Sequence, residues 1–224
     1  MVKSTATAPL AAGRTHAKFY SAGEEVANAL THGIACAASV VGLVFLIFYA
    51  IDHGSALHVS TLTIFGSSLI VLYLASTLYH AVTHIKIKRY LQLCDHSAIF
   101  LLIAGSYTPF MLNLPDNSAG IVVCIAVWAI AVFGIVFQPW LIKKGDKLNT
   151  LLYLIQGWMV VLAIEPVCAG LTDMGLNLLI AGGLLYSFGC IFYMWHRLPY
   201  HHAVWHLFVV GGSTAHYFAV MQTV

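Results

Sequence analysis

The sequence predicts an all-α fold: a polytopic membrane protein built as a seven-transmembrane-helix bundle, with its N-terminus cytoplasmic and its C-terminus outside. Three observations predict it: an apolar composition, long apolar runs that recur along the chain, and basic residues confined to alternate connections. Of the 224 residues, 60% are hydrophobic and only 8% are charged. This number of polar residues is too small to cover the surface of a water-soluble protein. We therefore expect the lipid bilayer to surround most of the chain.

Seven apolar runs in the sequence are long enough to cross a hydrocarbon core of about 30 Å. The connections are short, so we expect a flexible cytoplasmic tail over residues 1–20 and one seven-helix transmembrane domain over residues 21–224. The tail has no apolar stretch typical of signal peptides, so the first run must direct its own insertion. The predicted spans are Ala29–Ile51, Leu62–Val82, Ser97–Leu114, Ala119–Phe137, Leu148–Cys168, Leu176–Trp195 and Ala203–Val220.

Basic residues set the expected orientation of the bundle. With the N-terminus in the cytoplasm, all ten lysines and arginines fall on the cytoplasmic side, as the positive-inside rule requires. They lie in the tail and in the connections that follow spans two, four and six. The opposite connections contain Asp52, Asp116 and Asp173 and no basic residue.

The composition also excludes several classes of protein. The net charge is only +2 and the basic residues form no dense patch, so nucleic acid is not an expected partner. Five cysteines are scattered through the apolar runs without a CxxC pair, so we expect free thiols rather than disulfides. Membrane lipids are the expected partners of such a chain.

Three distant segments bring polar, titratable residues to the cytoplasmic side of the predicted bundle. Ser76 and His80 lie near the cytoplasmic end of span two, and Asp95 lies where span three begins. His202 and His206 lie at the start of span seven. An ionisable group within a bilayer is costly, by about 2.5–3.5 kcal/mol for an aspartate at a helix centre, so such a cluster usually serves a function.

The spacing of these residues favours a metal site. His202 and His206 are four residues apart, which places both imidazoles on one helical face about 6 Å apart. His80, which shares a face with Ser76, would complete a set of three histidines and leave the fourth tetrahedral position to water, as in catalytic zinc sites. Asp95 would then hydrogen-bond the water or an imidazole. The alternative is that these histidines only form hydrogen bonds between helices.

One face of the first span can support this site. Glu25, Asn28 and His32 share a helical face, and we expect them to lie behind the metal ligands as a second layer. A purely structural role is the alternative for the start of this helix. Ser21 and Glu24 fit a capping box there, and acidic residues near a helix N-terminus are favourable in any case.

Five stretches of the sequence carry motifs of a known family. They read GEEVANALTHG (Gly23–Gly33), ASTLYH (Ala75–His80), CDHSAIFLLIAGSYTPF (Cys94–Phe110), GGLLYSFGCIFY (Gly182–Tyr193) and PYHHAVWHLFVVGGS (Pro199–Ser213). Together they resemble the bacterial hemolysin III proteins, which belong with the progestin and adipoQ receptor family and, more distantly, with alkaline ceramidases. The resemblance runs from about Tyr20 to the C-terminus.

The resemblance implies a role for each matching residue. In the related receptors and ceramidases, histidines that match His80, His202 and His206 hold Zn²⁺, while residues that match Ser76 and Asp95 surround the bound water. We therefore expect a zinc-binding protein of the bacterial inner membrane that hydrolyses lipid amide or ester bonds and affects membrane lipid homeostasis. Asp95 is the expected general base, and Ser76 the expected hydrogen-bond donor to the water or the oxyanion.

Two other functions stay open on the sequence. Imidazoles and carboxylates in a helical bundle also build proton or ion pathways, which would need polar residues through the full depth of the membrane. The family name also indicates a pore-forming, haemolytic protein. A uniformly apolar chain without a secretion signal is a poor released toxin, so we expect any lysis to follow from altered membrane lipids.

Overall fold

The computed structural model describes residues 20–114 and 118–224, and within these ranges all regular structure is helical, which confirms the all-α class. The predicted tail therefore lies outside the described residues, apart from Tyr20. The elements are α1 (Ala22–His53), α2 (Ala56–Ala81), α3 (Ile85–Leu112), α4 (Ser118–Lys144), α5 (Asp146–Gly157), the 3-10 helix η1 (Met159–Ala163), α6 (Ile164–Gly170), α7 (Asp173–Met194) and α8 (His201–Met221).

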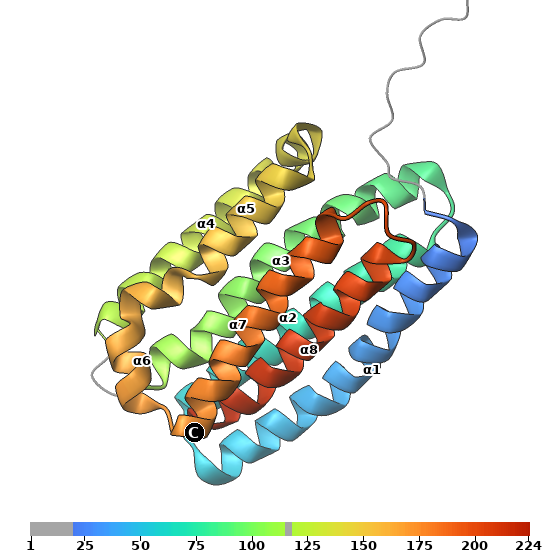
Figure 1. Cartoon of the computed structure of the whole chain (residues 1–224). Helices are drawn as coiled ribbons and strands as arrows, with labels where there is room; N and C mark the ends of the chain where they lie inside the picture. The colour runs from blue at the N-terminus through green and yellow to red at the C-terminus, as the bar shows by residue number, and fades with distance from the viewer. Residues whose placement is uncertain (1–19, 115–117) are drawn as a thin grey trace, which may run out of the picture.

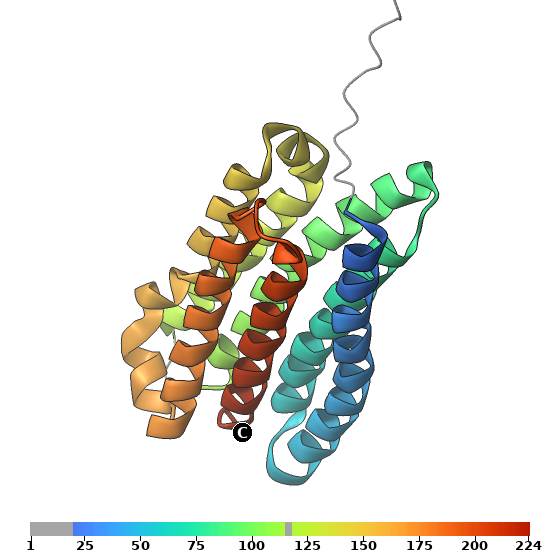
Figure 2. The same cartoon turned by 45° about the vertical axis from the view of Figure 1, so that its right-hand side comes forward.

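The helices stand side by side in one elongated bundle (Figure 1). Neighbours in sequence contact each other from α1 to α5, α5 contacts α7, α7 contacts α8, and α8 closes the ring against α1. Figure 2 shows α1 and α2 as a pair beside α8. The C-terminus lies at the end of the bundle opposite to the start of α1 (Figure 1). The end of α2 and the starts of α1, α3 and α8 therefore share one end of the bundle.

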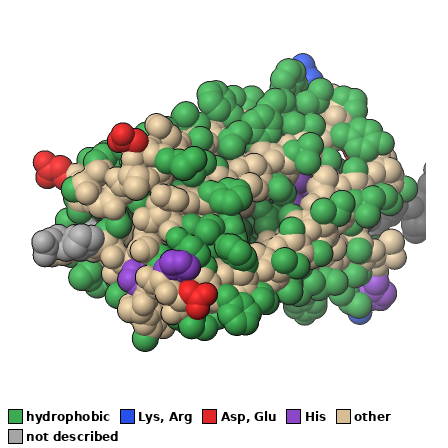
Figure 3. Space-filling model, turned by 90° about the horizontal axis from the view of Figure 1, so that it is seen from below, with side chains coloured by type: hydrophobic (Ala, Val, Ile, Leu, Met, Phe, Trp, Pro, Cys, Tyr) green, Lys and Arg blue, Asp and Glu red, His purple; other side chains and the backbone are tan. Residues whose placement is uncertain are grey.

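The outer surface of the bundle is apolar. Five helical segments of the described chain are long and apolar enough to cross a membrane: α1, α2, α4, the segment from α5 to α6, and α7. The other two long helices, α3 and α8, carry a buried aspartate and buried histidines, which lower their hydropathy. Figure 3 shows hydrophobic side chains along the flank, with acidic side chains toward one end and basic ones toward the other. The chain is therefore a multi-pass membrane protein.

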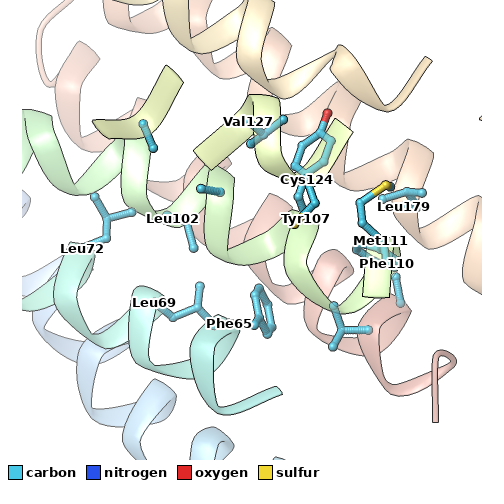
Figure 4. Packing of buried hydrophobic residues seen from close by; sticks show 14 of the residues in the cluster. Phe65, Leu69, Leu72, Leu102, Tyr107, Phe110, Met111, Cys124, Val127 and Leu179 are labelled. Atoms are coloured by element: carbon cyan, nitrogen blue, oxygen red, sulfur yellow. The ribbon is translucent and has the colours of Figure 1, made fainter. Parts of the chain in front are cut away.

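The central helix of the bundle is α3, because it contacts α5 and α8 as well as its neighbours in sequence. Its buried side chains Leu102 and Met111 belong to one hydrophobic core with Phe65 of α2 (Figure 4). A Cβ atom at Gly105 of α3 would clash with Ser68 of α2, so the glycine allows these two helices to approach closely. Residues of α3 are thereby brought to the middle of the bundle.

The predicted span Leu148–Cys168 is not one continuous helix, because α5 ends at Gly157 and the chain continues as η1 and α6. Tyr107 of α3 stabilises this break. Its hydroxyl donates to the Gly157 carbonyl and accepts from the Val160 amide, each at 2.7 Å. Two backbone groups that an α-helix would pair internally are thus satisfied by a neighbouring helix, which is how irregular backbone is tolerated inside a membrane protein.

Candidate metal centre

Three histidines from two helices meet at one end of the bundle. His80 lies in the last turn of α2, and His202 and His206 lie in the first two turns of α8. The ring centroids of His202 and His206 are 4.6 Å apart, and the His80 ring lies 5.0 Å from the first and 5.3 Å from the second. One nitrogen of each ring lies within 4.8 Å of the other two. The structure thus brings together the three residues that the spacing argument groups as ligands.

Hydrogen bonds to Nδ1 determine the tautomer of two of these rings. His80 Nδ1 donates to the carboxylate of Glu25, with 2.7 Å to Oε2. His206 Nδ1 donates to the backbone carbonyl of Asn28 at 3.2 Å and also lies 3.0 Å from Thr31 Oγ1. Because carboxylates and carbonyls only accept, both Nδ1 atoms carry a proton, and in the neutral form of each ring Nε2 then keeps the lone pair.

Buried nitrogens without a hydrogen-bond partner accumulate in this cluster. Within the three rings they are His80 Nε2, His206 Nε2 and both nitrogens of His202, and both nitrogens of the adjacent His32 also have no partner among the described residues. A buried polar atom without a partner costs about 1–3 kcal/mol, so several in one place require a compensating interaction. Neutral imidazole nitrogens are common Zn²⁺ ligands in proteins. The donor set therefore fits a zinc ion.

The predicted second layer on α1 contacts two of the three histidines. Besides the bond from His80 to Glu25, the Asn28 amide lies 3.4 Å from His80 Nδ1. The His32 ring stacks on His206, with 3.5 Å between the centroids and 11° between the planes. The face of α1 that carries Glu25, Asn28 and His32 therefore orients the cluster from one side.

Helix α1 also begins with the capping box that the sequence indicates as a purely structural role for this helix end. Ser21 and Glu24 form the predicted capping box, with the Ser21 side chain accepting from the Glu24 amide and the Glu24 side chain accepting from the Ser21 amide. Glu24 accepts in addition from the backbone amide of Tyr200, at the start of α8. Glu24 is thus occupied in fixing the helix ends, whereas Glu25 points its carboxylate at His80.

Ser76 and Asp95 lie near the cluster in different ways. Ser76 is fully buried one turn before His80, and its hydroxyl has no hydrogen-bond partner within the described ranges. Asp95 is buried too, and its carboxylate interacts electrostatically with His80 and His206. The Asp95 Oδ2 atom lies 3.4 Å from Nδ1 of His96, which is outside the three-histidine set.

Two residues that contact the site are not among the site residues that the sequence predicts. Lys88, which the sequence places in a connection between spans, is 5% exposed, and its ammonium lies 3.1 Å from Glu25 Oε1. If the predicted third span is extended to include Lys88, this lysine lies on the same helical face as Asp95, because the two residues are seven positions apart. The Tyr20 ring stacks on His202 at 5.0 Å, and no pattern in the sequence indicates that contact.

An apolar cavity of about 110 Å³ lies beside the histidines, between α3, α5, α7 and α8. Trp205 is next to both, since it lines the cavity and its ring lies 5.0 Å from His202 and 5.3 Å from His206. A second cavity of about 90 Å³ continues along η1 as far as Ile164. Both cavities are lined by Gly157, so they lie at the break between α5 and η1.

Several known proteins are similar in sequence to this chain over most of its length. A family model described as Haemolysin-III related matches residues 20–217. The chain is 48% identical to the Hemolysin-3 homolog of Bacillus subtilis (strain 168) over 198 residues, which cover 88% of this chain and 93% of that protein. It is 46% identical to Hemolysin-3 of Bacillus cereus over 198 residues, which cover 88% of this chain and 90% of that protein.

A more distant relative is human. The chain is 29% identical to the Monocyte to macrophage differentiation factor of Homo sapiens over 206 residues, which cover 89% of this chain and 84% of that protein. This match supports the relationship to the progestin and adipoQ receptor family that the motifs indicate. The family match covers residues 20–217 and includes every histidine of the cluster, and the chain therefore belongs to the haemolysin-III related family.

Proposed function

We propose that this chain is a zinc-dependent hydrolase that cleaves an amide or ester bond in a membrane lipid and thereby affects membrane lipid homeostasis. The observation that carries the proposal has two parts: one nitrogen from each of His80, His202 and His206 lies within 4.8 Å of the other two, and each of these buried rings has a nitrogen without a hydrogen-bond partner in the described chain. Three imidazole ligands would leave one tetrahedral position to water, the arrangement of catalytic rather than structural zinc.

The same proposal includes seven membrane crossings, a cytoplasmic N-terminus and an external C-terminus. Helices α3 and α8 pack in one bundle with the five apolar segments and would supply the two further spans. Lys86, Lys143 and Arg197 lie in or beside the connections at the end of the bundle where α8 begins. By the positive-inside rule this end, with the histidines, would face the cytoplasm. The membrane would be the bacterial inner membrane.

The residues around the histidines support hydrolysis. Zinc bound by imidazoles supplies hydroxide near neutral pH, because it lowers the pKa of a bound water to about 7, and it polarises a carbonyl oxygen. The Asp95 carboxylate, buried beside His96, would accept the proton of the attacking water as general base. The Ser76 hydroxyl, which has no partner among the described residues, would donate a hydrogen bond to the water or to the developing oxyanion.

The two cavities support a lipid as the substrate. Their walls are mainly apolar, with Leu102 and Val209 in the first and Val161 and Ile164 in the second. Val161 and Ile164 are also exposed on the outside of the bundle, where lipid would surround them. An acyl chain would pass from the bilayer into this space beside η1 and bring its amide or ester group toward Trp205, next to the histidines.

The two alternative functions are not favoured. A proton or ion pathway needs a continuous row of polar groups free to exchange protons or ions. The buried Thr61 at the opposite end instead donates to Asn113, and the three grouped imidazoles that have nitrogens without partners among the described residues lie at the end where α8 begins. A conducting pore needs a polar lining, whereas the walls of both cavities are mainly apolar.

Turnover of a lipid amide and a lipid ester by the purified protein in detergent tests the proposed function. Wild-type protein should release fatty acid, a chelator should stop the release, and added Zn²⁺ should restore it. His202→Ala should have no detectable turnover, because the site loses a ligand. His84→Ala is the matched control, since His84 is exposed at the start of α3, and its turnover should equal that of wild type. Turnover unchanged by His202→Ala would remove the mechanism.

A further inference from the structure

We infer that Lys88 is a positioning residue for the proposed zinc site and acts on His80 through Glu25; the inference rests on the proposed function. Lys88 lies in the first turn of α3, and only 5% of its surface is exposed. Lysine is almost never fully buried unless its charge is paired. The partners of the ammonium group therefore indicate what the side chain does.

The Lys88 ammonium has three oxygen partners, because it donates to two backbone carbonyls and forms an ion pair with Glu25. The nitrogen lies 2.7 Å from the carbonyl of Tyr79, 3.3 Å from the carbonyl of Val82 and 3.1 Å from Glu25 Oε1. The two carbonyls belong to the C-terminal end of α2, where carbonyl groups have no partner within the helix. Lys88 therefore joins the start of α3 to the end of α2 and holds one oxygen of the Glu25 carboxylate.

Glu25 transmits this restraint to the metal ligand. Its other oxygen, Oε2, accepts from His80 Nδ1 at 2.7 Å, so Lys88, Glu25 and His80 form a chain across α3, α1 and α2. A partner on Nδ1 fixes both the tautomer and the ring direction, and leaves Nε2 for a metal ion. A Glu25 carboxylate that has lost its ammonium partner can rotate, and the His80 ring then loses its fixed direction.

A purely structural role for Lys88 makes a different prediction. If Lys88 only joins α3 to α2, its loss weakens the bundle by the same amount whether residue 25 is charged or neutral. If it acts through Glu25, its loss weakens zinc binding only while residue 25 is a carboxylate. A double-mutant cycle of Lys88 and Glu25, with zinc affinity as the readout, separates the two roles.

The test measures zinc affinity of the full chain in detergent by competition with a chromophoric chelator. Lys88→Met should weaken zinc binding about 10- to 100-fold, the usual effect of losing a group that supports a metal ligand. Lys86→Met is the matched control, because it removes the same charge from an exposed position of the same turn, and its affinity should equal that of wild type. In the Glu25→Gln background, Lys88→Met should cause little further loss.

Cobalt gives a second readout that a loss of stability does not change. The visible spectrum of the Co²⁺-loaded protein reports the geometry of the ligands, and it should differ from wild type in Lys88→Met and match wild type in Lys86→Met. Equal zinc affinity in Lys88→Met and Lys86→Met would overturn the inference and leave the proposed zinc site intact. Additive losses in the double-mutant cycle would overturn it as well.

Two further outcomes are also decisive. Wild-type protein that binds no zinc would overturn both the inference and the proposed function. Should Lys88→Met fail to fold, Glu25→Gln is compared with Glu24→Gln, which removes the same charge from the neighbouring residue that caps α1. Only Glu25→Gln should weaken zinc binding, and equal affinities of these two variants would contradict the chain from Lys88 to His80.

Discussion

Buried polar groups differ in their hydrogen bonding between the two ends of the bundle. At the end that holds the C-terminus, Thr61 donates to the Asn113 side chain at 2.9 Å, and the Asn113 amide donates to Thr223 at 3.1 Å. At the other end, nitrogens of His80 and His202 are buried without a partner from the described residues. Satisfied polar groups join helices, whereas grouped nitrogens without partners indicate a missing ligand. The comparison distinguishes a structural network from a candidate binding site.

Zinc removal is the largest perturbation that this comparison predicts. An ion present at about 100 times its dissociation constant stabilises the folded state by about 2.7 kcal/mol, so a chelator should lower the free energy of unfolding of the zinc-loaded wild type by about that amount. His206→Ala should not respond to the chelator, because it lacks the site. Denaturant titrations in detergent micelles measure both effects. A response of the same size in His206→Ala would place the ion elsewhere.

Breaking the network at the opposite end should affect stability alone. Asn113→Ala leaves Thr61 and Thr223 without their shared partner, so the free energy of unfolding should fall by about 1–3 kcal/mol. The zinc content should equal that of wild type, as measured by elemental analysis of the same preparation. Loss of zinc from Asn113→Ala would show that the two ends are not independent.

Filling the cavity should have the smallest effect on stability and a selective effect on turnover. Gly183 lines both cavities, and a Cβ atom there would meet no atom of the described chain within 4 Å. Gly183→Leu should raise the free energy of unfolding by about 0.5–1 kcal/mol, because it removes a glycine from a helix interior. Lipid turnover should fall while the zinc content is unchanged.

Gly211→Leu is the matched control for the cavity variant. A Cβ atom at Gly211 would meet only Leu185, at an ordinary contact distance of 3.5 Å, and Gly211 does not line either cavity. Its lipid turnover should equal that of wild type. Full turnover in Gly183→Leu would mean that the substrate does not occupy this space.

The helices were predictable because a segment that crosses lipid must pair its own backbone groups, so a long apolar run almost always forms a helix. The interruption after Gly157 was not predictable in the same way. It depends on the hydroxyl of Tyr107, which comes from another helix, and apolar composition carries no information about that contact. The predicted start of the third span at Ser97 was too late, because α3 begins at Ile85. Its first turns are polar, so a search for apolar runs does not include them.

The grouping of the histidines was predictable from topology and helical spacing alone. Helix direction places His80 at the depth of His202 and His206, and four-residue spacing aligns the last two. The contact of Lys88 with Glu25 was not predictable, since it requires the mutual rotation of α1 and α3 about their axes. Rotation of this kind is decided by side-chain packing across the whole interface. Binding of zinc by the three histidines stays a prediction.

Elemental analysis of the purified protein tests most directly whether His80, His202 and His206 share one zinc ion. Wild type should contain about one zinc per chain, and so should His84→Ala, whose histidine is exposed beyond the end of α2, whereas His80→Ala should contain no bound zinc. Zinc retained in full by His80→Ala, or absent from wild-type protein purified without chelator, would contradict it.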